Sequence, residues 1–249
     1  MTRVYFFSDV HLGIDTPEVE RTKESKLLSL LDEIRDRGTH LYIVGDLFDF
    51  WFEYKYVIPR GFSRTLAALG SIVEAGVKVT YLVGNHDFAI GTFFSNDLEI
   101  TVEKGDLTVE HDGKTFYLFH GDGLAQNDSG YRLLRRVIRH PLARKGFSLL
   151  HPSVGFRFAR LFSHGSRDYT SRKFYGETDG MRIDAERRIR DGIDFVIMGH
   201  RHLPILERID RGWYVNLGDW LSHDSYAVYE NDGIQLLTYR NGSPESLSV

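Results

Sequence analysis

Residues 41–49 read Leu-Tyr-Ile-Val-Gly-Asp-Leu-Phe-Asp, an apolar run that stops at a glycine and an acid. A short run of β-branched and aromatic residues predicts a strand. The same pattern recurs where Val4 to Phe7 leads into Ser8-Asp9 and where Val77 to Val83 leads into Gly84-Asn85. The sequence therefore predicts strands whose carboxyl ends carry the polar residues.

Two helices and a second series of strands complete the predicted fold. Glu18 to Arg37 and Phe62 to Ala75 carry apolar residues at helical spacing, with a glycine just beyond each C-terminal end. The further strands, several of them hairpin-like, are Leu107 to His111, Phe116 to Phe119, Phe195 to Met198, Ile205 to Ile209, Trp213 to Val215, Tyr226 to Tyr229 and Ile234 to Thr238. We predict an α/β fold, a two-sheet sandwich flanked by helices, with loops from both sheets at one edge.

Composition narrows the class of protein and of metal site. The 249 residues fit one catalytic domain, and no apolar run approaches the roughly 20 residues of a membrane span. The apolar stretch at the N-terminus is too short for a signal peptide, so we expect a cytoplasmic protein. Cysteine is absent, which excludes disulfides and thiolate chemistry and leaves oxygen and imidazole nitrogen as metal ligands.

Charge is distributed unevenly. Tyr131 to Lys173 holds 11 Lys and Arg against one acid, a net charge of +10, while the remainder carries −14. We predict that residues 127–175 form a basic helical insertion, a lid over the site, with helices near Tyr131 to Ile138 and Val154 to Phe162. Residues 241–249 are expected to be a flexible tail.

Polar clusters end five of the apparent strands. They are Asp9-Val10-His11, Gly45-Asp46-Leu47-Phe48-Asp49, Gly84-Asn85-His86-Asp87, His120-Gly121-Asp122 and Gly199-His200-Arg201-His202. A single Asp or His at a strand end is usually a cap or a hydrogen-bonded loop residue. All five in this order favour a metal centre, because residues two apart on an extended segment point to the same side. Carboxylate, carboxamide and imidazole suit Mn²⁺, Fe or Zn²⁺.

These clusters resemble the calcineurin-like metallophosphoesterase superfamily, whose motifs are D-x-H, G-D-x-x-D, G-N-H-[DE], a later H and G-H-x-H. The resemblance implies two divalent ions, with Mn²⁺ as the favoured metal. It implies that Asp9, His11 and His202 hold the first ion and that Asn85, His120 and His200 hold the second. Asp46 would bridge the two ions, and Asp49 would support the site.

Two such ions lower the pKa of a shared water, so we expect a metal-bridging hydroxide to attack phosphorus in line. His86 is expected to donate a proton to the leaving oxygen or to bind phosphate, oriented by Asp87 or Asp49. A structural role for His86 is the alternative. The predicted catalytic residues are Asp46, Asn85 and His86, and the predicted substrate contacts at this centre are Asn85, His86 and His200.

Four stretches of sequence that extend beyond the metal-binding motifs resemble one family of the superfamily, the UDP-2,3-diacylglucosamine hydrolases. They are Phe7 to Gly13, Gly45 to Trp51, His120 to Leu124 and Asn216 to Trp220. That resemblance implies cleavage of an acylated UDP-sugar in lipid A synthesis, giving UMP and 2,3-diacylglucosamine 1-phosphate. It also implies that Asp128, Ser166, Thr170 and Lys173 hold the substrate.

The insertion interleaves apolar residues such as Phe156 and Leu161 with Arg157 and Arg160. This composition favours peripheral binding to an anionic membrane, on the cytoplasmic face of the inner membrane, although the same residues could simply pack the insertion onto the domain. The best-known members of the family carry Arg at the position of His86. Hydrolysis of another nucleotide-linked diphosphate or a phosphodiester therefore stays as an alternative, with a nucleic-acid phosphoesterase further behind. We expect no nucleic-acid partner, and the sequence leaves the oligomeric state open.

Overall fold

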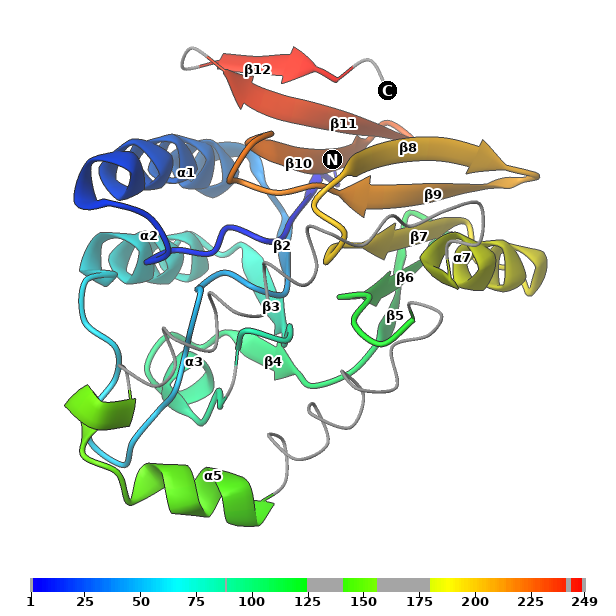
Figure 1. The fold of residues 1–249 in the computed structure, drawn as a ribbon. Helices are drawn as coiled ribbons and strands as arrows, with labels where there is room; N and C mark the ends of the chain where they lie inside the picture. The colour runs from blue at the N-terminus through cyan, green and yellow to red at the C-terminus, as the bar shows by residue number, and fades with distance from the viewer. Residues whose placement is uncertain (1, 88, 125–140, 156–179, 241–242, 248–249) are drawn as a thin grey trace.

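The computed structural model describes residues 2–87, 89–124, 141–155, 180–240 and 243–247. Figure 1 shows helices and strands alternating early in the chain, followed mainly by strands. The elements are β1 (Val4–Phe7), α1 (Pro17–Arg37), β2 (His40–Val44), α2 (Ser63–Glu74), β3 (Lys78–Leu82), α3 (Phe93–Asn96), β4 (Thr101–Glu103), β5 (Leu107–His111), β6 (Lys114–Phe119), α5 (Pro141–Ser148), α7 (Gly180–Arg190), β7 (Phe195–Met198), β8 (Pro204–Ile209), β9 (Gly212–Leu217), β10 (Ser225–Glu230), β11 (Gly233–Arg240) and β12 (Ser243–Ser246). All the predicted strands and both early helices are present.

The described strands form two sheets. One has seven strands in the order β12-β11-β10-β1-β2-β3-β4, and the other has five in the order β5-β6-β7-β9-β8. β1 to β4 run parallel in the first sheet, and β6, β7 and β9 run parallel in the second. Parallel neighbours deliver their carboxyl ends to the same edge of a sheet, where ligands usually bind. The loops that carry the polar clusters follow these strands.

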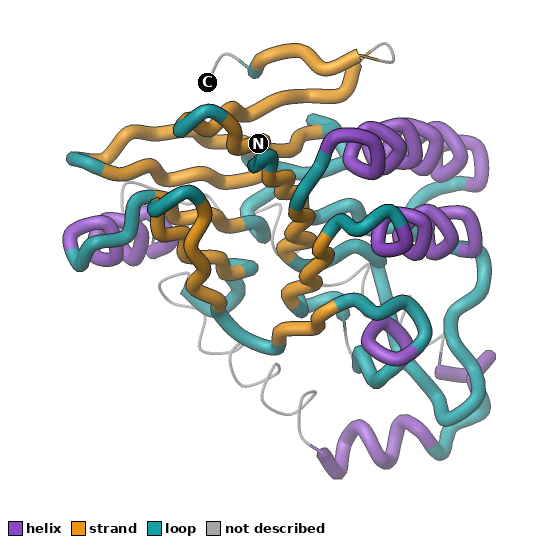
Figure 2. Tube along the Cα trace, turned by 180° about the vertical axis from the view of Figure 1, so that it is seen from behind, coloured by secondary structure: helices purple, strands orange, loops and turns teal. Residues whose placement is uncertain are grey.

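Apolar layers hold the sheets and helices together, as the predicted sandwich requires. Between the sheets, Phe6 packs against Phe116 with ring centroids 5.9 Å apart. Figure 2 shows α1 and α2 on one side of the molecule and α7 on the other. Leu30 of α1 and Leu69 of α2 are fully buried against the first sheet, and Ala185 of α7 is fully buried beside the second. Each large side chain buried in this way contributes about 1.5–3 kcal/mol.

The end of the chain differs from the expected flexible tail. Residues Ser243–Ser246 form β12, which pairs with β11, and Leu247 packs against the core between the sheets. No strand is predicted here from the residues, because Ser-Pro-Glu-Ser is polar on both faces. Strands β10 and β11 also join the first sheet beside β1, so the two sheets do not follow the two series of strands in the sequence.

Of the predicted insertion, the structure describes residues 141–155, including helix α5. The stretch Tyr131 to Ile138 and nearly all of Val154 to Phe162 lie outside the described residues. Phe147 of α5 packs on Phe50 and Phe52 in the loop after β2, with ring centroids 6.1 and 4.6 Å away. None of the helices among the described residues has the length and apolarity needed to cross a membrane.

Candidate metal centre

All seven side chains predicted as metal ligands meet at one place. Asp9 and His11 follow β1, Asp46 follows β2 and Asn85 follows β3 in the first sheet. His120 follows β6, and His200 and His202 follow β7 in the second sheet. The site therefore lies where the carboxyl ends of both sheets converge.

The backbone at the site is left-handed, whereas an extended backbone was expected from the sequence. Residues two apart were expected to converge because an extended backbone alternates its side chains. Five of the seven instead have positive φ, namely Asp9 (53°), His11 (48°), Asp46 (55°), His200 (65°) and His202 (58°). Such angles are uncommon in residues other than glycine and tolerated best by Asn, Asp and His. The pairs converge because the chain turns tightly at each of these residues.

Backbone hydrogen bonds beyond the strand ends hold these turns. The amide of Asp9 donates to the carbonyl of Gly45 at 3.1 Å, and the amide of His11 donates to the carbonyl of Asp46 at 3.0 Å. They continue the pairing of β1 with β2 past the last strand residues. The amide of Gly199 likewise donates to the carbonyl of His120 at 3.1 Å and ties the loops of the second sheet together.

Asp46 stands between the two sheets, and one of its carboxylate oxygens is fixed by backbone. The amide of His86 donates to Oδ1 of Asp46 at 2.8 Å. The other oxygen, Oδ2, lies 3.3 Å from Nε2 of His120 and 3.9 Å from Nε2 of His11. Oδ2 of Asp46 is thus the atom that faces imidazoles from both halves of the fold.

Asp9 repeats this arrangement on the other side of the site. The amide of His200 donates to Oδ2 of Asp9 at 2.8 Å. Its Oδ1 lies 3.2 Å from Nε2 of His202 and 3.7 Å from Nε2 of His11, yet it accepts no hydrogen bond within the described part of the chain. A fully buried carboxylate oxygen in that position suits a cation ligand better than a hydrogen-bond acceptor.

Three groups of side chains have donor atoms close enough to hold a divalent cation, and one of them, His11, Asp46 and His86, shares a member with each of the other two. In the first of those two, Asp9, His11 and His202 offer donor atoms within 4.8 Å of one another, and in the second, Asp46, His120 and His200 do the same. Oδ1 of Asn85 adds an oxygen to the second group, 2.9 Å from Nε2 of His120. Mixed oxygen and imidazole donors suit Mn²⁺, Fe and Zn²⁺, so the residues present fit divalent metals.

Burial and close charge shape the ionisation of the group. Burial opposes the charged form of Asp9 and Asp46, but neighbouring histidines hold the pKa of each carboxyl well below its usual range. Burial would lower the pKa of His120, yet the Asp46 carboxylate outweighs it and raises that pKa to about 10. Burial, helped by the charge of His120, lowers the pKa of His200 to about 4. Without metal, protons on the imidazoles therefore balance the buried carboxylates.

His86 has a fixed ring orientation. Its Nδ1 lies 2.8 Å from the backbone carbonyl of Asp49 and donates to it in the corresponding tautomer, while Oδ1 of Asp49 lies 3.6 Å away. Of the two acids expected to orient His86, Asp49 is thus the one in contact. The Nε2 atom of His86 can therefore interact with a bound ligand. The ring packs edge-on against His11 with centroids 4.7 Å apart, which places it at the border of the first group.

Asp87 acts on the loops instead. Its carboxylate accepts hydrogen bonds from the amides of Asp46 and Gly84, at 2.9 and 2.8 Å, and from the hydroxyl of Tyr81 at 2.6 Å. Burial, followed by the charge of Asp46, raises the pKa of Asp87 to about 6. Asp87 thus positions Asp46. The G-N-H-[DE] motif predicts an acid at position 87 but does not indicate that this acid positions Asp46.

Two further positioning residues were missed by the sequence reasoning. Lys23 of α1 is buried, and its Nζ donates to the carbonyl of His11 at 3.0 Å. Asp219 follows β9, and its Oδ2 lies 3.6 Å from Nδ1 of His202. Carboxylates behind ligand histidines orient the ring and raise its basicity. The role of Lys23 could not be predicted from the sequence, because a lysine within a helix normally extends into solvent.

The predicted substrate residues outside this centre, Asp128, Ser166, Thr170 and Lys173, lie outside the described residues.

Gly45→Ala is expected to damage the centre. Gly45 has φ +85°, and a Cβ there would collide with the His120 ring and the Gly84 backbone. We expect divalent-metal affinity to fall at least tenfold, since left-handed strain costs about 1–2 kcal/mol before the collision is counted. Metal titration by calorimetry measures this. Gly105→Ala is the matched control, because open space surrounds that position; equal affinities in the two variants would contradict the prediction.

Metal binding is expected to release protons. His120 is protonated below its pKa of about 10 in the metal-free protein, whereas a ligand histidine must be neutral. Metal affinity should therefore rise with pH from 7 toward 10. Calorimetric titration of Mn²⁺ in buffers of different ionisation enthalpy counts the protons, with about one expected from His120. A heat that does not depend on the buffer would disprove this coupling.

Comparison with known proteins agrees with this geometry. The family model described as Calcineurin-like phosphoesterase matches residues 2–204. A UDP-2,3-diacylglucosamine hydrolase of Porphyromonas gingivalis is 34% identical, covering 94% of this chain and 97% of that protein. One of Pseudomonas aeruginosa is 31% identical, covering 87% of this chain and 90% of that protein.

Solved structures share the fold at lower sequence identity. A Vps29 single mutant from Entamoeba histolytica has a TM-score of 0.51 at 12% identity, covering 98% of this chain and 96% of that one. An archaeal phosphodiesterase has a TM-score of 0.50 at 14% identity, covering 94% and 98% of the two chains. With a family model matched over residues 2–204 and relatives similar over nearly their whole length, the chain belongs to the calcineurin-like phosphoesterase family.

Proposed function

We propose that this protein hydrolyses UDP-2,3-diacylglucosamine with the help of two divalent metal ions, releasing UMP and 2,3-diacylglucosamine 1-phosphate. The observation that carries the proposal is the position of Asp46 Oδ2, which faces imidazoles of both donor groups. The substrate is taken from the names of relatives that match the chain over nearly its whole length.

The two donor groups support one ligand assignment. Asp9, His11 and His202 would hold the first ion, and Asn85, His120 and His200 would hold the second. Asp46 contributes to both. Oxygen and nitrogen donors without any thiolate accommodate several divalent metals, including Fe and Zn²⁺. We favour Mn²⁺, the metal that the family resemblance implies.

When bound, divalent ions supply an activated water near neutral pH and neutralise the diphosphate charge. The chain's own residues position the rest of the reaction. His86 is held through Nδ1 by the Asp49 carbonyl, so its protonated form presents Nε2–H to the oxygen that leaves phosphorus. Asn85 and His200, which lie beside His120 in the second donor group, would contact the phosphate. The net reaction adds water across one phosphoanhydride bond.

Asp46→Ala should abolish UMP release. The substitution removes the carboxylate shared by both donor groups, which is also the negative charge 3.3 Å from Nε2 of His120. We expect kcat/KM to fall by about 10³-fold or more, the scale typical of losing a preorganised charge in an active site. UMP release from UDP-2,3-diacylglucosamine with added Mn²⁺ is measured.

Asp36→Ala serves as the control, because Asp36 lies exposed near the end of α1 and pairs only with Arg35 in the described structure. The same assay is run with other nucleotide-linked diphosphates and with simple phosphodiesters. If metal-loaded wild-type protein cleaves those compounds but leaves UDP-2,3-diacylglucosamine intact, the proposed substrate is wrong.

We further propose that the protein works at the surface of an anionic membrane, on its cytoplasmic face. The described part of the basic segment exposes apolar side chains at Leu142, Leu149, Leu150 and Val154, with Leu149 82% exposed. The loop after β2 adds Tyr56, which is 85% exposed. Exposed leucines within a segment of net charge +10 suit the interface of an anionic bilayer.

Leu149→Ser combined with Leu150→Ser should weaken binding to vesicles. Each leucine loses its apolar contact with the bilayer, and we expect the partition coefficient on phosphatidylglycerol-containing vesicles to fall about tenfold or more. Co-sedimentation measures it. Val19→Ser combined with Ile183→Ser is the matched control, since both residues are exposed on other helices. Equal sedimentation of the two double variants would refute membrane docking through this face.

A further inference from the structure

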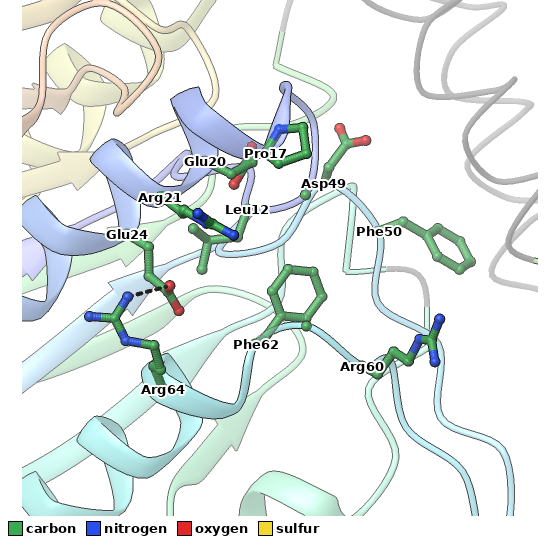
Figure 3. A pocket seen from close by; sticks show the side chains of 12 residues that line it. Leu12, Pro17, Glu20, Arg21, Glu24, Asp49, Phe50, Arg60, Phe62 and Arg64 are labelled. Carbon is green, nitrogen blue, oxygen red and sulfur yellow. Dashed lines mark hydrogen bonds and ion pairs between the residues drawn. The ribbon is translucent and has the colours of Figure 1, made fainter.

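A cavity of about 520 Å³ opens beside the metal centre, between the starts of α1 and α2 and the loop after β2 (Figure 3). Two of its lining residues connect it to the centre. Leu12 directly follows His11, and Oδ1 of Asp49 lies 3.6 Å from Nδ1 of His86. The volume is in the range of small-molecule sites. The cavity therefore lies next to residues of the metal centre.

Of the three acids that line the cavity, Asp49 lies against histidines of the metal centre, and the other two have cationic or polar partners. Glu24 accepts hydrogen bonds from Arg64 at 3.2 Å and from Thr65 at 3.1 Å. Glu20 pairs with the buried Lys23 at 2.9 Å. These carboxylates thus have their charges balanced within the wall.

Two arginines of the cavity are different. Arg21 and Arg60 are exposed in the wall and make no ion pair or hydrogen bond within the described ranges of the chain. An arginine presents five N–H donors in a planar fork that matches phosphate and carbonyl oxygens. The cavity thus offers unused donors to an anionic ligand.

An aromatic ring stands between these arginines. Figure 3 shows the Phe62 ring in the middle of the lining, with Arg21 on one side and Arg60 on the other. Phe62 is half-buried and packs on Phe48 with ring centroids 4.7 Å apart. Gly13, at φ +97°, approaches so closely that a Cβ there would lie 3.0 Å from Cζ of Phe62. The ring is held by its neighbours and can receive a flat partner.

The start of α2 adds a favourable potential for an anion. No described side chain caps this helix, and its first turn holds no acid. The first amides of an uncapped helix are free donors and carry the positive end of the helix dipole. Gly61 and Arg64, at this end of α2, line the cavity.

We propose that this cavity binds the nucleotide half of the substrate, with the base against Phe62, Arg60 toward the phosphate and Arg21 toward the acceptor oxygens of the base. A nucleoside monophosphate combines a flat ring with an anion, which are the two features that the wall provides for. The choice of uridine rests on the proposed function. The cavity lies next to Asp49, so the phosphate of such a ligand points to the metal centre.

The test measures the affinities of UMP and inorganic phosphate for the Mn²⁺-loaded protein by calorimetry. Phosphate alone can bind at the metal centre, so the ratio of the two affinities reports on the cavity. We expect Arg21→Glu, Arg60→Glu and Phe62→Leu each to lower the UMP-to-phosphate ratio about tenfold, the usual weight of one charge-assisted or aromatic contact. The same variants should raise KM for the full substrate more than they lower kcat.

Arg37→Glu is the matched control, because it makes the same charge change at the exposed far end of α1 and should leave the ratio unchanged. The two arginine variants alter exposed side chains and keep the test valid even if Phe62→Leu unfolds. The proposal fails if the UMP-to-phosphate ratio in the arginine variants equals that of Arg37→Glu. It also fails if those variants weaken binding of 2,3-diacylglucosamine 1-phosphate instead of UMP. Failure of the proposed function shows separately, as intact UDP-2,3-diacylglucosamine after incubation with a wild-type protein that binds UMP.

Discussion

Two carboxylates withdrawn from water, Asp9 and Asp46, are the constraint on which the site depends, with exposed fractions of 0% and 1%. Removing a carboxylate from water costs several kcal/mol unless positive charge compensates it. Each has one oxygen fixed by a backbone amide, so only the other remains for a cation. In the metal-free protein the imidazoles supply that charge. The same geometry therefore explains both the high pKa of His120 and the fit of the centre to divalent metals.

Holding these oxygens in place requires backbone that the sheets would not otherwise adopt. Five metal-centre residues have left-handed φ, each at a cost of about 1 kcal/mol or more, which is a large share of the ~5–15 kcal/mol that keeps a domain folded. The surrounding structure maintains these turns. Backbone pairing continues beyond β1 and β2, and Asp87 fixes the amide of Asp46 from behind. A ligand that binds only this arrangement, such as a metal ion, adds its binding energy to the stability of the fold.

Much of the fold and of the centre was predictable because local patterns specify them. Buried strands such as β7 are continuous apolar runs, and the five polar clusters follow such runs directly. Helix α7 was not predicted, because its apolar face is a narrow stripe among charged residues, formed by Met181, Ala185 and Ile189. The contacts of Lys23 and Asp219 with the centre depend on how distant elements pack. The backbone of Asp9 and His11 could not be read from D-x-H, because extended and turned segments both bring such a pair together.

Specificity has to come from outside the metal ions, which recognise a diphosphate whatever it carries. Phe50 connects the cavity next to the centre with helix α5. Phe50 lines the cavity beside Asp49, and its ring packs 6.1 Å from that of Phe147 in α5. The position of α5 therefore helps to set one wall of the cavity, so contact of this segment with a membrane would also bear on the cavity next to the catalytic residues. Because Phe147 packs on both Phe50 and Phe52, any shift of α5 is expected to be transmitted to the wall of the cavity through these two aromatic contacts.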